Sequence, residues 1–202
     1  MIAGKYAVQC SENFSVIEKN ECIEVMFVYK TASVPKFEYK IIYSAYFDGK
    51  LNIRAEYPGT DNMPDIPVFA MDFKMKKTYS NFRYYGMGPE ENYIDRLCGA
   101  RLGVYTSNAI KNMSKYLNPQ ECGNRTGVRY LEVTDHNGTG LKFTQTNHPF
   151  EMSVLPYSAY EIENATHMEE LPAVNYTWVR IAAKQMGVGG DDSWGAPVHD
   201  EY

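Results

Sequence analysis

Val128-Arg-Tyr-Leu-Glu-Val-Thr-Asp-His-Asn-Gly-Thr-Gly-Leu-Lys-Phe-Thr-Gln-Thr146 is the stretch that decides the fold. It contains two runs rich in β-branched and aromatic residues, Val128–Asp135 and Leu141–Thr146, on either side of Asn137-Gly138. Asn-Gly between two such runs favours a type I′ hairpin turn, in which both central residues take φ > 0. The stretch therefore predicts two antiparallel strands joined by a tight turn.

Runs of the same kind recur along the chain and are separated by Gly, Pro, Asn and Asp. Asp48-Gly49 predicts a second hairpin, and Pro58–Pro67, with three prolines, predicts a loop. Many short strands with frequent turns indicate an all-β sandwich. The further strands are predicted over Ile23–Tyr29, Ile41–Phe47, Leu51–Tyr57, Phe69–Met75, Phe82–Tyr85, Phe150–Leu155 and Trp178–Met186.

Two segments depart from this strand pattern. Ser158-Ala-Tyr-Glu161 fits a capping box and predicts one short helix over Ala159–His167. Residues 92–116 combine charges and glycines without a helical period, so they are predicted to form a long ordered loop. No internal repeat or shift in composition marks a boundary, and residues 1–202 are predicted to form a single domain.

Composition excludes several classes of protein. The chain has 202 residues, 44% of them hydrophobic, which is enough for a sizeable core. A net charge of −5 gives no reason to expect nucleic acid or an anionic membrane as partner. No window is apolar enough to span a membrane, and the first residues do not resemble a signal peptide. We therefore expect a cytoplasmic protein with reduced thiols at its four scattered cysteines, Cys10, Cys22, Cys98 and Cys122.

A glycine-rich stretch, Met186-Gly-Val-Gly-Gly-Asp-Asp-Ser-Trp-Gly-Ala-Pro197, contains one of the two tryptophans. Glycines allow φ > 0 and close approach of the backbone, so a specifically shaped loop is expected here. Loops on rigid scaffolds often carry binding residues. One interpretation is that Trp194 is such a residue; the other is that it caps the local core while Asp191 and Asp192 cap turns.

Catalytic motifs are not evident in the sequence. The adjacent acids Glu90-Glu91, Glu169-Glu170 and Asp191-Asp192 cannot easily flank one glycosidic bond at the ~5–5.5 Å that a retaining glycosidase needs. No metal-binding or phosphate-binding motif is present either. The residues alone therefore predict a binding surface rather than a catalytic centre or metal site. The four histidines are isolated from one another in the chain: His136, His148, His167 and His199.

Three motifs together resemble those of the large bacterial β-galactosidases of glycoside hydrolase family 2. They occur in the family's order and at family-like spacing, and similarity extends from about Pro67 to the end of the chain. In the second motif Cys122 stands where the family usually has Asn, so a polar contact made there is lost or changed. The motifs are Tyr85-Gly-Met-Gly-Pro-Glu-Glu-Asn-Tyr-Ile-Asp-Arg96, Pro119-Gln-Glu-Cys-Gly-Asn-Arg125 and Met186–Trp194.

In that family these motifs belong to the C-terminal β-sandwich domain, which some members encode as a separate small chain. The resemblance implies an antiparallel supersandwich similar to galactose mutarotase, here as a truncated C-terminal domain of a larger enzyme. It also implies that the catalytic glutamates lie in a separate TIM barrel, with Mg and Na as its cofactors. The expected partners are that barrel-containing remainder, as a homo-oligomer, and a galactoside such as lactose.

The resemblance assigns roles to few residues of this chain. Trp194 corresponds to an aromatic platform at the rim of the active site, which binds mainly the leaving-group sugar. Gly189, Gly190, Asp191 and Asp192 would support that loop. A second group either supports the rim or forms a buried structural network: Glu91, Asn92, Asp95 and Arg96.

Two other functions stay open at this point. Asn147-His-Pro-Phe150 is similar to a stretch of aldose 1-epimerases in which a histidine acts as general acid and base. A free-standing epimerase on the same fold is therefore one alternative. A carbohydrate-binding module without a catalytic partner is the other.

Overall fold

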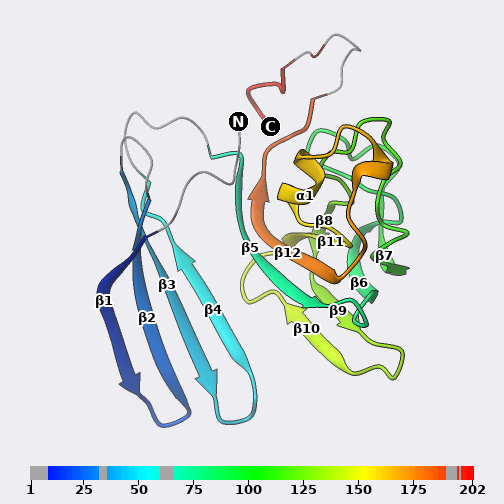
Figure 1. The fold of residues 1–202 in the computed structure, drawn as a ribbon. Coiled ribbons are helices and arrows are strands. Elements are labelled where there is room, and N and C mark those ends of the chain that lie inside the picture. Colours follow the sequence, from blue (N-terminus) through cyan, green and yellow to red (C-terminus); the bar gives the residue numbers. More distant parts are fainter. Residues whose placement is uncertain (1–8, 32–35, 60–65, 190–194, 196) are drawn as a thin grey trace. The chain divides into compact units, whose positions relative to one another are not determined.

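The computed structural model describes residues 9–31, 36–59, 66–189, 195 and 197–202 (Figure 1). The chain divides into two compact units, Met1–Asp65 and Ile66–Tyr202, and the boundary falls in the segment predicted as a loop. The described strands form three four-stranded sheets in which every paired strand is antiparallel. The all-β antiparallel sandwich class is thus confirmed, whereas one domain over residues 1–202 stays a prediction.

The first unit is a simple meander with the strand order β1-β2-β3-β4. Its strands are β1 (Gln9–Glu18), β2 (Cys22–Lys30), β3 (Glu38–Tyr46) and β4 (Leu51–Glu56). The sequence predicted the last three. It did not predict β1, because that strand is polar over its first half and its pairing with β2 is irregular between Cys10 and Phe14.

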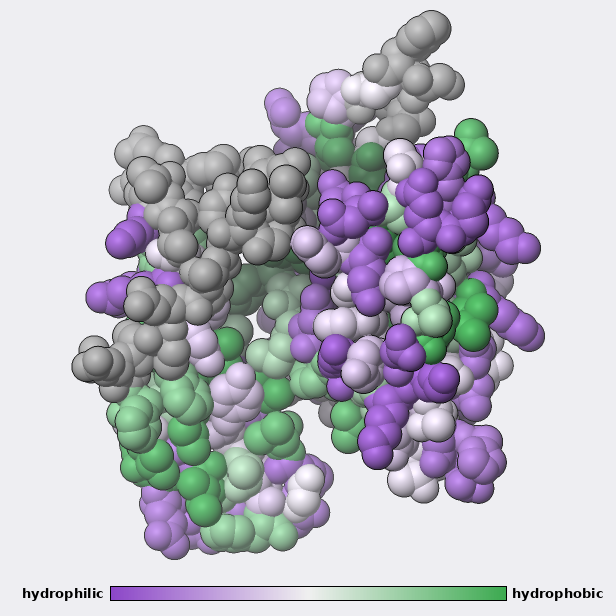
Figure 2. All heavy atoms as spheres, in the orientation of Figure 1, coloured by the Kyte–Doolittle hydropathy of each residue, from purple (hydrophilic) through white to green (hydrophobic). Residues whose placement is uncertain are grey.

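One face of this sheet is apolar. Val16 pairs with Val25, which pairs with Tyr43, which in turn pairs with Ile53, so all four point to the same side. The side chain of Phe14, on the same side, is 65% exposed. Figure 2 shows hydrophobic residues gathered over these strands. We call this surface the apolar face of the first sheet; it comprises Phe14, Val16, Ile23, Val25, Phe27, Ile41, Tyr43, Leu51 and Ile53.

The second unit is built from two sheets with the orders β10-β9-β6-β7 and β5-β12-β11-β8. Their inner faces meet in one core. In this core Phe82, Leu131 and Val133 of the β10-β9-β6-β7 sheet pack with Met152 and Val179 of the β5-β12-β11-β8 sheet. Such face-to-face packing is the arrangement of a β-sandwich. The strands are β5 (Val68–Lys76), β6 (Asn81–Gly88), β7 (Arg101–Asn108), β8 (Arg125–Val128), β9 (Tyr130–Thr134), β10 (Gly140–Thr144), β11 (Phe150–Leu155) and β12 (Tyr176–Gln185).

The prediction of a long loop over residues 92–116 is wrong, because β7 lies inside it and pairs with β6 along its whole length. Gly103, which obscured this strand, and Gly88 of the paired strand β6 have a packing role. A Cβ at Gly103 would lie 2.9 Å from the Tyr105 hydroxyl, and one at Gly88 would lie 2.8 Å from the same ring. Glycine within a strand marks such a close approach, so the Tyr105 ring covers two strand positions where a side chain cannot fit.

The predicted helix begins where the capping box placed it but ends early. Ser158 Oγ accepts a hydrogen bond from the Glu161 backbone N–H, and the Glu161 carboxylate accepts one from the Ser158 N–H at 2.8 Å. Helix α1 spans Ala159–Glu163, and Asn164 closes it by donating through its side chain to Tyr160 O. A 3₁₀ turn, Met168–Glu170, follows.

The hairpin around Asn137-Gly138 is confirmed, but its turn is larger than predicted. The Asp135 N–H donates to Thr139 O, so the loop holds three residues, 136–138, and not two. Gly138 takes φ +80° and its N–H donates to Asp135 O. A three-residue loop with glycine in the left-handed region is the next most common hairpin turn. The Phe47–Gly49 turn closes in the same way.

Candidate functional site

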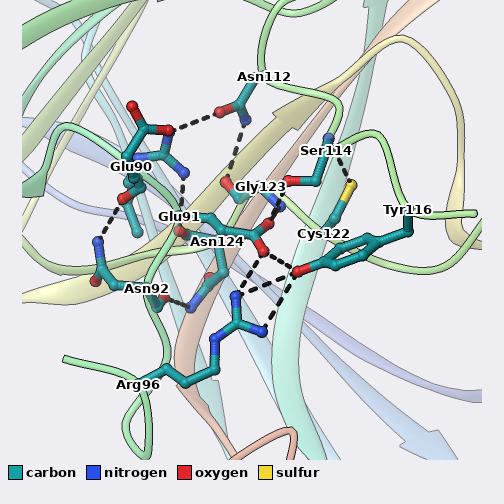
Figure 3. A network of polar contacts seen from close by, with 11 residues as sticks. Glu90, Glu91, Asn92, Arg96, Asn112, Ser114, Tyr116, Cys122, Gly123 and Asn124 are labelled. Atoms are coloured by element: carbon teal, nitrogen blue, oxygen red, sulfur yellow. Dashed lines mark hydrogen bonds and ion pairs between the residues drawn. The ribbon is translucent and has the colours of Figure 1, made fainter. Parts of the chain in front are cut away.

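Two of the three motifs meet in a polar network beyond the end of β6 (Figure 3). Its centre is the Glu91 carboxylate, whose side chain is only 12% exposed. One carboxylate oxygen accepts hydrogen bonds from Gly123 N–H and Ser114 Oγ–H, each at 2.7 Å. The other accepts from Arg96 Nη2 at 2.7 Å and from the Tyr116 hydroxyl. Glu91 thus joins segments that are more than 30 residues apart.

The electrostatics of this centre favour an ionised Glu91. Burial raises the pKa of Glu91, but the hydrogen bonds donated by Tyr116, Gly123, Ser114 and Arg96 outweigh it, so the pKa lies below its ordinary value of 4.5. Burial and the bond to Glu91 raise the pKa of Tyr116. The pair is therefore a carboxylate and a neutral phenol at neutral pH, which suits a structural anchor better than a general acid.

Asn92 is buried and uses its full hydrogen-bonding capacity. Its Nδ2 donates to the carbonyl oxygens of Met87, at 3.1 Å, and Glu90, at 3.0 Å. Its Oδ1 accepts from the Thr126 N–H at 2.9 Å and from the Thr126 hydroxyl at 2.6 Å. An amide with two donors and two acceptor positions filled has none left for a ligand.

Arg125 places a buried guanidinium among neutral acceptors. It donates to the Tyr84 hydroxyl at 3.0 Å, to Pro89 O at 3.1 Å, to Asn124 O at 3.0 Å and to Asn112 Oδ1 at 2.9 Å. A buried charge is costly unless its hydrogen bonds are satisfied. Arg125 thereby fixes β8 against the Pro89 segment.

Cys122 lies beside this network, in a small apolar cluster with Met113, Leu155 and Ile162. Its sulfur accepts a weak hydrogen bond from the Ser114 N–H at 3.4 Å. Burial raises the pKa of this thiol. At position 122 this chain therefore has a neutral thiol whose described polar partner is Ser114.

Asp95 contacts the glycine-rich stretch rather than the Glu91 network. Its Oδ2 accepts a hydrogen bond from the Gly189 N–H at 2.8 Å. Glu91 and Arg96 are in direct contact. Asn92 reaches the second motif through Asn124, whose side chain donates to Asn92 O at 3.1 Å. Gly190, Asp191, Asp192 and Trp194 lie outside the described residues, so their roles stay predictions.

The histidines do not assemble a catalytic centre: His136, His148, His167 and His199 are all exposed and lie in separate segments outside the strands and helices. Within the described ranges, no group of three or more His, Cys, Asp and Glu side chains is placed to hold a metal ion. Among the same residues, no helix has the length and apolar character needed to cross a membrane.

Sequence reasoning missed several members of the network. Ser114 and Tyr116 lie in the segment predicted as loop, and nothing in their spacing showed that both would reach Glu91. Gly123 gave a better indication, since it lies in the second motif. It takes φ +73°, and a Cβ there would lie 2.6 Å from Asn112 Nδ2. Only glycine fits that combination of backbone and space.

The fold and the polar network together define the class of protein. It is an antiparallel β-sandwich whose described polar side chains hold its loops in place. The chain belongs to the family described as beta galactosidase small chain, which matches residues 4–202.

Relatives at high identity are β-galactosidases. The enzyme of Halalkalibacterium halodurans is 46% identical over 203 residues, covering 99% of this chain and 20% of the relative. That of Streptococcus thermophilus is 40% identical, covering 100% of this chain and 19% of the relative. The β-galactosidase small subunit of Latilactobacillus sakei is 33% identical, covering 95% and 63%. The chain therefore spans about a fifth of the large relatives.

Proposed function

We propose that this chain is the domain of a β-galactosidase that completes the rim of the active site, for hydrolysis of terminal β-D-galactosides such as lactose. Trp194 is its substrate-binding residue and forms a platform for the leaving-group sugar. The catalytic glutamates lie in a separate barrel domain, and the chain alone is inactive. Mg and Na bind in that barrel and not in this chain.

The observation that carries the proposal is the match of the whole chain to β-galactosidases that are about five times longer. The Met186–Trp194 motif lies within the matched residues 4–202. In the described part of that motif, Gly187 and Gly189 approach Asp95 closely, which agrees with a loop of defined shape. A shaped loop on a rigid sandwich suits the presentation of a binding side chain.

The chemistry of an indole fits this role. The C–H face of a sugar packs on an aromatic ring while the hydroxyls stay available to polar groups and water. Binding the leaving group lowers KM; where the contact tightens in the transition state, it also raises kcat. A platform of this kind needs no acid, base or metal of its own.

The apolar face of the first sheet supports a large protein partner. Phe14 and Val16 are 65% and 58% exposed, and they lie on the same side as Val25 and Phe27. Contiguous exposed apolar surface marks sites of protein association. We assign this face to contact with the rest of the β-galactosidase.

The test is a hybrid enzyme in which this chain replaces the matched region of the Halalkalibacterium halodurans β-galactosidase. Trp194→Ala should lower kcat/KM for lactose by about 5- to 150-fold, the equivalent of about 1–3 kcal/mol. Trp194→Phe should recover part of it, because a flat apolar face remains. Unfolding of the isolated chain should change little.

The competing role of Trp194 as a core cap makes the opposite prediction. Truncating a buried tryptophan costs about 3–5 kcal/mol of stability. Such a loss in the isolated chain, with unchanged lactose kinetics in the hybrid, would show that Trp194 is not a platform.

A further inference from the structure

Asp95 links two of the motifs through a contact with Gly189, which lies 94 residues further along the chain. Its Oδ2 accepts the Gly189 N–H at 2.8 Å. Gly189 is the last residue described before the segment 190–194, which leads to Trp194. The contact therefore acts on residues 187–189, through which the chain enters that segment. We call these three residues the limb.

Asp95 itself stands on a rigid support. It lies in a tight turn closed by Tyr93 and Arg96, in which the Arg96 N–H donates to Tyr93 O at 2.9 Å. The Tyr93 side chain is almost fully buried. Arg96 is tied in turn to the Glu91 carboxylate at 2.7 Å. The polar network thus fixes the position from which Asp95 reaches the glycine-rich limb.

Gly187 shows how closely the limb approaches Asp95. A Cβ at Gly187 would lie 2.6 Å from Asp95 Cγ and 2.9 Å from Val198 Cγ1. The Gly187 N–H donates to Tyr202 O at 3.2 Å, and the Met186 N–H donates to Pro67 O. The limb is therefore held between Asp95 on one side and the C-terminal residues on the other, with no space for a side chain.

The second oxygen of the carboxylate adds an independent observation. Asp95 Oδ1 is buried and has no hydrogen-bond partner among the described residues. A buried unpaired oxygen costs free energy, so Asp95 is a poor choice for stability alone. Its one described hydrogen bond is charge-assisted and directional, which suits positioning.

We propose that Asp95 is a positioning residue, whose carboxylate holds the Gly187–Gly189 limb against the Tyr93–Arg96 turn and thereby fixes where the chain enters the segment that ends at Trp194. The effect on catalysis rests on the proposed function of Trp194. The positioning itself does not, and the two are measured separately.

The first measurement is tryptophan fluorescence of the 202-residue chain in a Trp178→Phe background, where Trp194 is the only tryptophan. Asp95→Ala should raise the acrylamide quenching constant by about twofold or more, because loss of the hydrogen bond from Gly189 releases the limb. Gly187→Ala should do the same by displacing it. Asp95→Asn, whose amide oxygen can still accept the Gly189 N–H, should stay near the parent, as should the control Glu163→Ala at an exposed carboxylate in α1.

Circular dichroism identifies variants that fail to fold. If Asp95→Ala is one of them, Gly187→Ala and Asp95→Asn decide the matter. Unchanged quenching in the folded Asp95→Ala and Gly187→Ala chains overturns the proposal, and so does an Asp95→Asn chain that behaves like Asp95→Ala.

The second measurement is lactose kinetics of the hybrid enzyme. Asp95→Ala should raise KM more than it lowers kcat, with rescue by Asp95→Asn, because a displaced platform weakens substrate binding. Increased quenching with unchanged KM and kcat would support Asp95 as a positioning residue and overturn the platform role of Trp194. The two hypotheses thus fail in different assays.

Discussion

Glu91→Gln should destabilise the second unit by about 2–4 kcal/mol at neutral pH. Each carboxylate oxygen of Glu91 accepts two hydrogen bonds, one pair from Gly123 and Ser114 and the other from Arg96 and Tyr116. A glutamine must turn its NH₂ group toward one of these pairs of donors. Two hydrogen bonds to a charged acceptor, worth about 1.5–3 kcal/mol each, are then lost, and water near the 42% exposed Arg96 side chain restores part.

Glu151→Gln is the matched control, because the same substitution meets the opposite environment. Burial raises the pKa of Glu151, so its ionised form is disfavoured in the folded chain. Asn124 donates to one carboxylate oxygen at 2.7 Å, and a glutamine oxygen can accept that bond. The bond from the Gln185 N–H is long, at 3.4 Å. Glu151→Gln should therefore be neutral or stabilising, within about 1 kcal/mol.

The pH dependence of the two variants should also differ in sign. The folded pKa of Glu91 lies below its ordinary value of 4.5, so its stabilisation is complete above that pH and is lost as the pH falls through the folded pKa. The folded pKa of Glu151 is raised, so its contribution is present below 4.5 and is lost as the pH rises through the folded pKa. The difference in free energy of unfolding between the parent and Glu91→Gln should therefore become smaller in acid.

Urea unfolding followed by tryptophan emission is the assay, since both tryptophans lie in the second unit. Series at pH 7 and down to about pH 3.5 give the free energy of unfolding for the parent and both variants. A Glu91→Gln loss below about 0.5 kcal/mol at pH 7, or a larger loss for Glu151→Gln, would refute the assignment of Glu91 as the anchor of the network.

Further predictions concern backbone and thiols. Gly138→Val should lower the free energy of unfolding, measured with urea, by about 1–3 kcal/mol. All of this loss comes from backbone strain at φ +80°, since no atom lies within 4 Å of the new Cβ. A neutral result would contradict the three-residue turn at 136–138. Gly140→Ala should cost more than about 2 kcal/mol, since its Cβ would clash with Val133 O; an unchanged midpoint would contradict the register of β9 and β10. In the folded chain the exposed Cys98 should react with a maleimide well before the buried Cys22 and Cys122. Fast labelling of Cys122 would contradict its burial.

Most strands could be predicted because their residues alternate and turn residues bound them. The β3–β4 and β9–β10 hairpins follow from local pattern alone, since Asp48-Gly49 and Asn137-Gly138 mark both turns. β7 could not be predicted, because Gly103 interrupts its pattern for a tertiary reason: the ring of Tyr105 lies over it.

The polar network could be predicted only in part. Adjacent residues of one motif, such as Glu91 and Arg96, were expected to act together, and their ion pair is local. The contributions of Ser114, Gly123 and Gly189 depend on chain closure over 23, 32 and 94 residues. No local periodicity carries that information. The three-residue turn at 136–138 was also beyond sequence reasoning, because Asn-Gly fits both turn lengths.

Hydrolysis of a chromogenic β-galactoside tests the central claim most directly. We expect no turnover from this chain alone and none from the Halalkalibacterium halodurans enzyme lacking the matched region, with activity restored in the hybrid. Turnover by the isolated chain that disappears on substitution of one of its own acids would contradict the account, as would full activity in the enzyme that lacks this region.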